Sequence, residues 1–229
     1  MSAYEVDGFA FIGRTFDEYC RMFDLEATQL DGQRILDCPA GPASFVSTAH
    51  DRGVDATGVD IRYREPPPAL ADRCAAAIDD ADTQLRAARD LFDWTYYGSV
   101  EDRIALLERT TRRFLADYPA GRESGRYVWA DLPRLPFADD RFSLVLSSHF
   151  LFLYGDRLSR SFHRETLFEL VRVATDEVRL YPLVELDGTP YPHLDAVRRI
   201  LEDAGLGTEI RPVPFAFLRG ATEMLVIEP

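Results

Sequence analysis

The sequence contains no lysine and no asparagine, and all 26 of its basic residues are arginine. They are outnumbered by 39 acidic residues, so the 229-residue chain has a formal net charge of −13. A chain this acidic binds poorly to nucleic-acid phosphates or to an anionic membrane surface, so we expect neither as a partner. The lack of lysine also restricts the chemistry, because a base in any site must be histidine, tyrosine or a carboxylate, and a permanent cation must be arginine.

Long hydrophobic runs and paired cysteines are also lacking. No apolar stretch reaches the roughly 20 residues that a membrane span needs, and residues 1–10 lack the positive start of a signal peptide, so we expect a cytoplasmic protein. Cys20, Cys38 and Cys74 are odd in number and far apart, without a CxxC pair. This spacing favours reduced thiols over a disulfide framework, and it predicts no metal site.

What the sequence does contain is the alternation of a doubly wound α/β protein. Short apolar runs that predict strands alternate with amphipathic helical stretches, and 46% of the residues are hydrophobic, enough for the core of a single domain over residues 1–229. The predicted strands are residues 34–38, 55–60, 127–130, 142–147 and 177–183, and the predicted helices are residues 15–25, 43–50, 162–173 and 194–204. Alternation of this kind implies a mainly parallel, Rossmann-like sheet.

Two segments depart from this rhythm. Residues 209–218 and 223–227 are extended runs separated by a short turn, so they predict an antiparallel hairpin that brings the sheet to seven strands. Residues 62–126 are too long for a simple crossover between strands and carry helical periodicity over 69–91 and 100–118. We expect an inserted helical cap over the carboxyl ends of the strands, and an N-terminal helical segment over residues 1–32.

The strongest motif is the turn that follows the first predicted strand, with the sequence Asp37-Cys38-Pro39-Ala40-Gly41. Small residues in such a turn let the backbone approach a ligand closely, and the helix that follows offers its N–H groups. Asp60 ends the second strand about 20 residues later, where a carboxylate can accept both hydroxyls of a ribose. Taken alone the turn fits an ordinary strand-to-helix connection equally well; its spacing to Asp60 favours a nucleotide-like ligand.

With these features the sequence resembles the class I S-adenosylmethionine-dependent methyltransferases. The resemblance covers about residue 33 to the C-terminus and includes the turn, Asp60, an acidic-apolar pair after the third strand, the run LPFADDRFSLV at 135–145 and the terminal hairpin. It implies S-adenosylmethionine as the cofactor. It implies that Asp37 to Gly41 hold the methionine part of the cofactor, Asp60 the ribose, and Asp131 with Leu132 the adenine. The full set of predicted cofactor-binding residues is Arg14, Asp37, Cys38, Pro39, Ala40, Gly41, Asp60, Ile61, Asp131, Leu132 and Ser148.

The turn departs from the family's D-x-G-x-G-x-G pattern. Pro39 and Ala43 occupy the first and third glycine positions, which leaves only Gly41. The chain has no GxxxxGK[ST] phosphate loop, no GxGxxG and no GxSxG nucleophile elbow, which argues against an NTPase, a nicotinamide enzyme and a serine hydrolase.

Candidates for the chemistry lie after the fourth strand and in the cap. His149, Tyr154 and Tyr97 are the predicted catalytic residues. His149 lies at a strand's carboxyl end, and the ordinary pKa of a histidine suits proton transfer. Alternatives remain open for each kind of residue. His149 fits a hydrogen-bonded histidine that shapes the pocket, Tyr97 fits the packing of the cap, and Arg14 fits either a partner for the cofactor's carboxylate or an exposed helix start.

We therefore expect methyl transfer to a small-molecule acceptor, because a capped pocket in an acidic protein suits a small ligand. The alternative is a noncatalytic S-adenosylmethionine-binding sensor or scaffold, which the degenerate turn keeps open. A nucleic-acid methyltransferase would need a basic stripe, for which residues 103–113 give the only hint. The lysine-free, acidic composition is similar to that of proteins from extreme halophiles, so the charge indicates a salty solvent more than a substrate.

Overall fold

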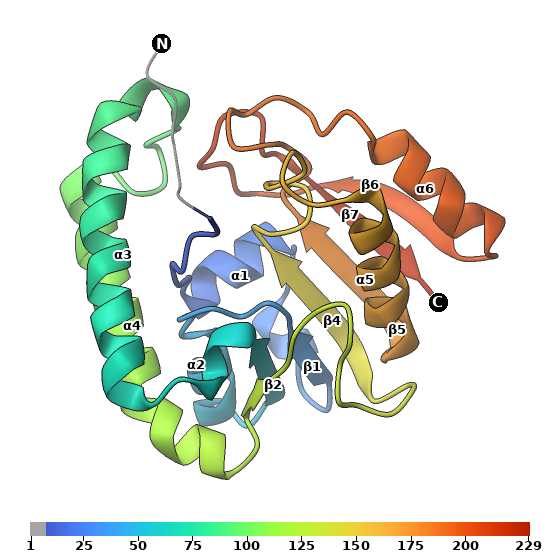
Figure 1. The fold of residues 1–229 in the computed structure, drawn as a ribbon, viewed down its shortest axis with the longest axis horizontal. Helices are drawn as coiled ribbons and strands as arrows, with labels where there is room; N and C mark the ends of the chain where they lie inside the picture. The colour runs from blue at the N-terminus through green and yellow to red at the C-terminus, as the bar shows by residue number, and fades with distance from the viewer. Residues whose placement is uncertain (1–7) are drawn as a thin grey trace.

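The computed structural model describes residues 8–229, so the first seven residues of the predicted N-terminal segment, and most of the stretch tested for a signal peptide, lie outside the described residues. Seven strands form one sheet in the order β3-β2-β1-β4-β5-β7-β6 (Figure 1). They are β1 (Arg34–Asp37), β2 (Asp55–Asp60), β3 (Tyr127–Trp129), β4 (Phe142–Ser148), β5 (Ala174–Tyr181), β6 (Gly207–Pro212) and β7 (Glu223–Glu228).

The direction of the strands confirms the predicted fold class. Strands β1 to β5 pair in parallel, and β7 lies antiparallel between β5 and β6. The central strands are buried on both faces, which is why they appear in the sequence as short, almost continuous apolar runs. The order of the strands reverses between β1 and β4, and ligands of open α/β sheets bind at the carboxyl ends of the strands at such a point.

Helices cover both faces of the sheet, as in a doubly wound fold. On one face α1 (Phe16–Met22) and α2 (Phe45–Asp51) pack against a core that contains Ile35 of β1; on the other, α5 (Arg160–Arg172) and α6 (Leu194–Asp203) pack against a core that contains Leu36. Neighbouring residues of one strand therefore serve opposite layers, because side chains alternate across a strand.

The insertion after β2 contains two long helices, α3 (Pro67–Ala87) and α4 (Val100–Glu123), which lie side by side along one side of the molecule (Figure 1). Two short 3₁₀ turns, η2 (Ile61–Arg64) and η3 (Arg89–Leu91), flank α3, and a third, η1 (Ala27–Gln29), follows α1. None of the helices within residues 8–229 combines the length and apolarity needed to cross a bilayer.

The predicted hairpin needs one correction. The prediction of a strand over residues 209–218 is wrong at its end, because β6 stops at Pro212 and residues 213–222 leave the sheet. Proline lacks the N–H that a ladder requires, and Pro212 and Pro214 both fall at this exit. The released segment packs against the insertion instead, where the rings of Phe217 and Phe92 stack with their centroids 4.6 Å apart.

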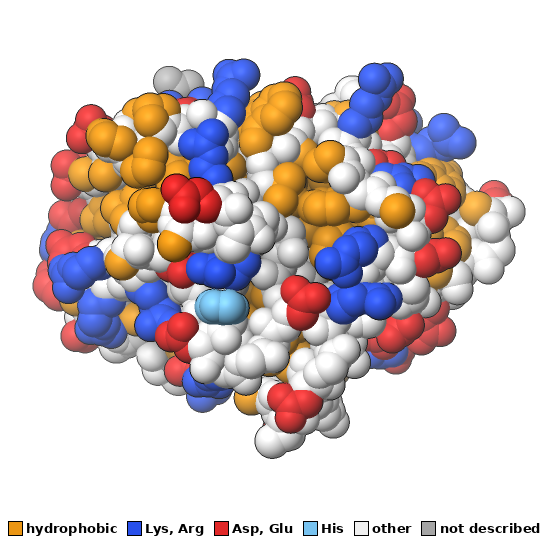
Figure 2. All heavy atoms as spheres, turned by 90° about the horizontal axis from the view of Figure 1, so that it is seen from below, with side chains coloured by type: hydrophobic (Ala, Val, Ile, Leu, Met, Phe, Trp, Pro, Cys, Tyr) orange, Lys and Arg blue, Asp and Glu red, His pale blue; other side chains and the backbone are white. Residues whose placement is uncertain are grey.

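Surface charges are mixed on the face of the molecule shown in Figure 2. Arginine side chains lie among aspartate and glutamate side chains there, with apolar groups between them. Of the arginines at 103–113 that hinted at a basic stripe, Arg103 is only 2% exposed, so it belongs to the interior.

Candidate functional site

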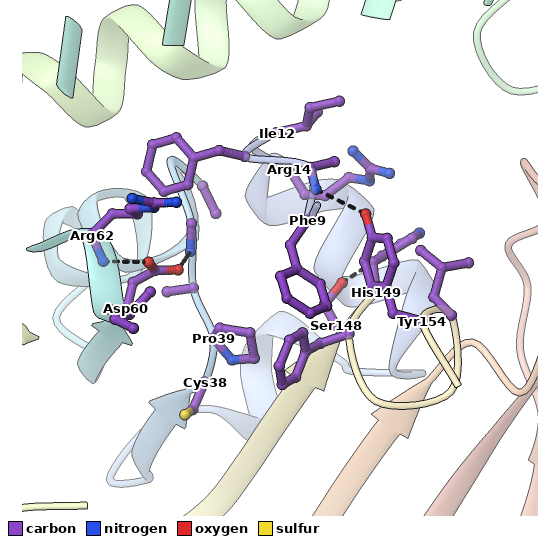
Figure 3. Close-up of a pocket in the computed structure, with 18 of the residues that line it drawn as sticks. Phe9, Ile12, Arg14, Cys38, Pro39, Asp60, Arg62, Ser148, His149 and Tyr154 are labelled. Carbon is purple, nitrogen blue, oxygen red and sulfur yellow. Dashed lines mark hydrogen bonds between the residues drawn. The ribbon is translucent and has the colours of Figure 1, made fainter. Parts of the chain in front are cut away.

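A cavity of about 390 Å³ opens at the carboxyl ends of the parallel strands and extends beneath α3 and α4. Its floor is made by residues that follow β1, β2, β3 and β4, and its far wall comes from the insertion and from the segment ahead of α1. Figure 3 shows Asp60 and Arg62 on one side of it, and His149 and Tyr154 on the opposite side. A volume of this size suits a small molecule.

The turn after β1 is tied to the end of β2 by its backbone. The N–H of Ala40 donates to the carbonyl of Val59 at 2.8 Å, and the hydroxyl of Tyr63 donates to the carbonyl of Gly41 at 2.6 Å. Gly41 has a φ of +53°, and within residues 38–44 no other residue has a positive φ. Pro39 and Ala43, which replace the family's other two glycines, therefore occupy positions where the backbone conformation does not require glycine.

Asp60 closes the same loop with its side chain. Its two carboxylate oxygens accept the N–H of Gly41 at 2.9 Å and the N–H of Arg62 at 2.8 Å (Figure 3). Burial raises the pKa of this carboxyl, and the hydrogen bonds from the two N–H groups oppose the rise. Each oxygen keeps a second lone pair, so the carboxylate can hold the turn and still accept hydroxyl groups from the cavity.

Asp37 lies behind the turn and is not among the cavity-lining residues. Both of its oxygens accept the hydroxyl of Tyr19, at 2.8 and 2.9 Å, and it is Tyr19 of α1 that faces the cavity. Burial raises the pKa of Asp37 well above its ordinary value, and the hydrogen bond from Tyr19 counters this only in part.

This raised pKa predicts how stability changes with pH. An acid that binds its proton more tightly in the folded protein stabilises the fold below its unfolded pKa of about 4, and that contribution is lost as the pH rises toward the folded pKa. The variant Asp37→Asn cannot titrate, so its free energy of unfolding should fall less than that of the wild type between about pH 5 and about pH 8. Urea unfolding at both pH values measures the difference, with the exposed Asp55→Asn as control; parallel curves for Asp37→Asn and wild type would contradict the prediction.

A buried carboxylate joins α1 to the insertion. Glu18 is fully buried and accepts the hydroxyl of Tyr97, and it contacts the guanidinium groups of Arg103 at 3.3 Å and Arg14 at 3.6 Å. Its other oxygen accepts the N–H of Thr15 at 2.7 Å, which completes a capping box at the start of α1. Both arginines line the cavity, whereas Tyr97 does not.

His149 follows β4 directly and has a backbone φ of +52°. Its N–H donates to the carbonyl of Tyr181 at 2.6 Å, and its Nδ1 lies 2.7 Å from the hydroxyl of Ser148. A left-handed backbone conformation costs free energy in a residue other than glycine, and residues with this conformation are found mostly at functional sites. Burial lowers the pKa of the imidazole well below its usual value, and the charges of Arg14 and Arg103 lower it further, so the ring is neutral at pH 7.

The segment ahead of α1 forms one wall of the cavity. It runs between α3 and α1, dark blue in Figure 1, and the N–H of Ala10 donates to the hydroxyl of Tyr154 at 2.9 Å. Phe9 packs edge-on against the ring of Tyr154, with centroids 5.0 Å apart. At its other end Gly13 passes so close to the turn after β1 that an added Cβ would lie 2.2 Å from the carbonyl oxygen of Pro42, so glycine is required there.

The structure brings most of the predicted residues to one cavity. Those that line it are Arg14, Cys38, Pro39, Ala40, Gly41, Asp60, Ile61, Asp131, Leu132, Ser148, His149 and Tyr154. The sequence reasoning missed Tyr19, Arg103 and Phe217, which also line it. The sequence did contain a signal for Arg103, which stands three residues after Val100 and four before Leu107, on the apolar face of its helix. A charged side chain on such a face is unusual unless it has a partner or a function.

Comparison with known proteins finds a relative by sequence. The chain is 31% identical over 217 residues to the uncharacterized protein MJ0045 of Methanocaldococcus jannaschii, and the alignment covers 94% of each chain. No family model matches the chain.

Solved structures of methyltransferases are similar at a lower level. An S-adenosylmethionine-dependent methyltransferase from Aquifex aeolicus is 16% identical with a TM-score of 0.42, over 92% of this chain and 90% of that one. The magnesium protoporphyrin IX methyltransferase of Synechocystis PCC 6803, with bound S-adenosylmethionine, is 12% identical with a TM-score of 0.42, over 93% and 90%. Scores at this level transfer neither a substrate nor a mechanism.

Proposed function

We propose that this chain, which belongs to the same family as the Methanocaldococcus jannaschii protein MJ0045, transfers a methyl group from S-adenosylmethionine to a small-molecule acceptor. One observation carries the proposal. A single cavity at the reversal point of the sheet combines the turn after β1, the buried carboxylate of Asp60 after β2 and the histidine after β4. The first two suit a nucleoside, and the third suits the reacting end of a ligand that spans the cavity.

The residues present fit S-adenosylmethionine by their chemistry. Asp60 is an acceptor for the two ribose hydroxyls, and Ile61 and Leu132 offer apolar surface to an adenine. The small residues of the turn after β1 let a ligand approach the backbone closely. Arg14, which lines the cavity, can pair with the carboxylate of the methionine part.

When bound, S-adenosylmethionine supplies a methyl group on a positively charged sulfur. The protein's part is to align an acceptor atom with that group and to exclude water, for which the largely apolar wall of the cavity is suited. Where the acceptor is a hydroxyl, its proton must leave as the new bond forms. The imidazole of His149 can take that proton once the carboxylate of the methionine part offsets the charge of Arg14, which lowers the pKa of the ring in the empty cavity. The hydroxyl of Ser148, 2.7 Å from Nδ1, orients the ring.

Calorimetric titration with S-adenosylmethionine tests the binding part of the proposal. It is best done at high salt, because a chain of net charge −13 repels itself in dilute buffer. We expect one site per chain. Folded protein, verified by circular dichroism, that takes up no S-adenosylmethionine would refute the proposal.

The variant His149→Gln separates catalysis from binding. With a radiolabelled methyl group and a panel of small acceptors, its turnover should fall by about 100-fold or more, because general-base assistance is worth at least that much, while its affinity for S-adenosylmethionine stays near that of the wild type. His50→Gln, an exposed histidine at the end of α2, is the matched control and should keep full turnover. Equal turnover in the two variants would remove His149 from catalysis.

A noncatalytic sensor or scaffold is the second candidate. The observation that favoured it was the loss of two glycines from the turn, but only Gly41 has the backbone conformation that calls for glycine. Binding of S-adenosylmethionine without any methylated product across the acceptor panel would support the sensor.

A further inference from the structure

We propose that the methyl acceptor is an organic acid with an apolar body, whose anionic group binds Arg103 of the insertion. This inference rests on the proposed function and deepens it by naming the class of acceptor. It concerns the part of the cavity that α3 and α4 line.

Arg103 is held in a defined position inside the protein. Its side chain is 2% exposed, and its Nη1 lies 3.3 Å from Oε1 of Glu18. The guanidinium carbon lies over two rings, 4.5 Å from the centroid of Tyr97 and 5.8 Å from that of Phe217. Ring faces fix the plane of a guanidinium without consuming its N–H donors, because the attraction is to the π-system.

This guanidinium lies among apolar side chains of the cavity wall. Apolar side chains from the insertion and from the loop before β7 line the same cavity, namely Leu85, Phe92, Leu107, Phe217 and Leu218. In such surroundings a charge-assisted hydrogen bond is stronger than in water, and a guanidinium binds a carboxylate through two parallel N–H donors. An acceptor that fits both features carries an anionic group next to an apolar or aromatic body.

A purely structural role explains Arg103 less well. Glu18 is already engaged by Thr15, Tyr97 and Arg14, so the carboxylate has partners besides Arg103. An arginine that served only to join α4 to α1 would have no need to line the cavity, as Arg103 does. Arg103 and His149 both line this cavity, which places the anion site in the same compartment as the proposed base.

The roles of the two arginines then differ. Arg14, ahead of α1, serves the carboxylate of the cofactor, and Arg103, on the insertion, serves the acid group of the acceptor. The atom that is methylated is a separate hydroxyl of the acceptor. Its O–H bond breaks as the new O–CH₃ bond forms, the proton passes to His149, and the sulfonium becomes a neutral thioether.

Binding of matched acids and amides tests this inference. The probes are benzoate, 2-naphthoate and octanoate, each compared with its neutral amide by calorimetry on protein saturated with S-adenosylhomocysteine, so that no turnover interferes. We expect at least one acid to bind about 10-fold or more tightly than its amide, as a charge-assisted bidentate pair would give. In Arg103→Met this preference should fall to about twofold or less, with the affinity for S-adenosylhomocysteine near that of the wild type.

Arg109→Met is the control variant, since Arg109 is an exposed arginine on the same helix, and it should keep the preference. Arg103→Lys keeps the positive charge but loses the two parallel N–H donors of the guanidinium, so it should retain only part of the preference for the acid. This variant replaces Arg103→Met in the test if Arg103→Met does not fold. The inference is overturned if no acid binds better than its amide in the wild type, or if Arg103→Met keeps the preference, while S-adenosylhomocysteine still binds. Failure of S-adenosylhomocysteine itself to bind would overturn the proposed function and this inference with it.

Discussion

Replacing Asp60 by alanine is expected to weaken the binding of S-adenosylmethionine by about 100-fold or more. The carboxylate accepts the N–H groups of Gly41 and Arg62 and faces the cavity, so its loss frees the turn and removes the acceptor for the ribose. A hydrogen bond to a charged group contributes about 1.5–3 kcal/mol, and about 1.4 kcal/mol corresponds to a tenfold change in affinity, so two such bonds account for this loss. Calorimetric titration of the variant measures it.

Asp55→Ala provides the matched control, because Asp55 is an exposed acid at the opposite end of the same strand β2. Its affinity for S-adenosylmethionine should equal that of the wild type. A second variant, Asp60→Asn, keeps one acceptor oxygen but places an amide donor against one of the two N–H groups, so we expect it to bind nearly as poorly as Asp60→Ala. Unchanged affinity in both Asp60 variants would show that the nucleoside lies elsewhere.

Replacing Glu18 by alanine is expected to lower the free energy of unfolding by about 3–5 kcal/mol, the range found when one partner of a buried ion pair is removed. Glu18 is fully buried, and without it the guanidinium of Arg103 loses the carboxylate that compensates its charge. The change also removes the capping-box hydrogen bond to the N–H of Thr15 at the start of α1. Urea unfolding followed by circular dichroism measures the loss.

Two comparisons make this prediction specific. Glu101 pairs with Arg86 at 2.7 Å on the surface, where it is 66% exposed, so Glu101→Ala should lower the free energy of unfolding far less than Glu18→Ala does. The double variant Glu18→Gln with Arg103→Met removes both charges of the buried pair and should recover part of the stability lost in Glu18→Ala. A loss for Glu18→Ala as small as that for Glu101→Ala would mean that the buried pair contributes nothing to the fold.

The sequence determined the fold class and the place of the site. Parallel central strands are buried on both faces, so they appear as short apolar runs such as residues 34–38, and the alternation with helices fixes the doubly wound topology. The residues that follow the predicted strands then indicated the floor of the cavity, because the carboxyl ends of parallel strands meet at one edge of the sheet. That is why Gly41, Asp60 and His149, far apart in the chain, could be predicted to lie together, and all three line one cavity.

Only the tertiary structure decided which side chains face the cavity. Local periodicity places a residue on the apolar side of its element, but it does not show what packs against that side. Asp37 therefore lies behind the turn while Tyr19, its hydrogen-bond partner from α1, lines the cavity. Tyr97 is likewise directed to Glu18, and Arg103 faces the cavity, because the approach of α4 to α1 is set by long-range packing that no short window of sequence contains.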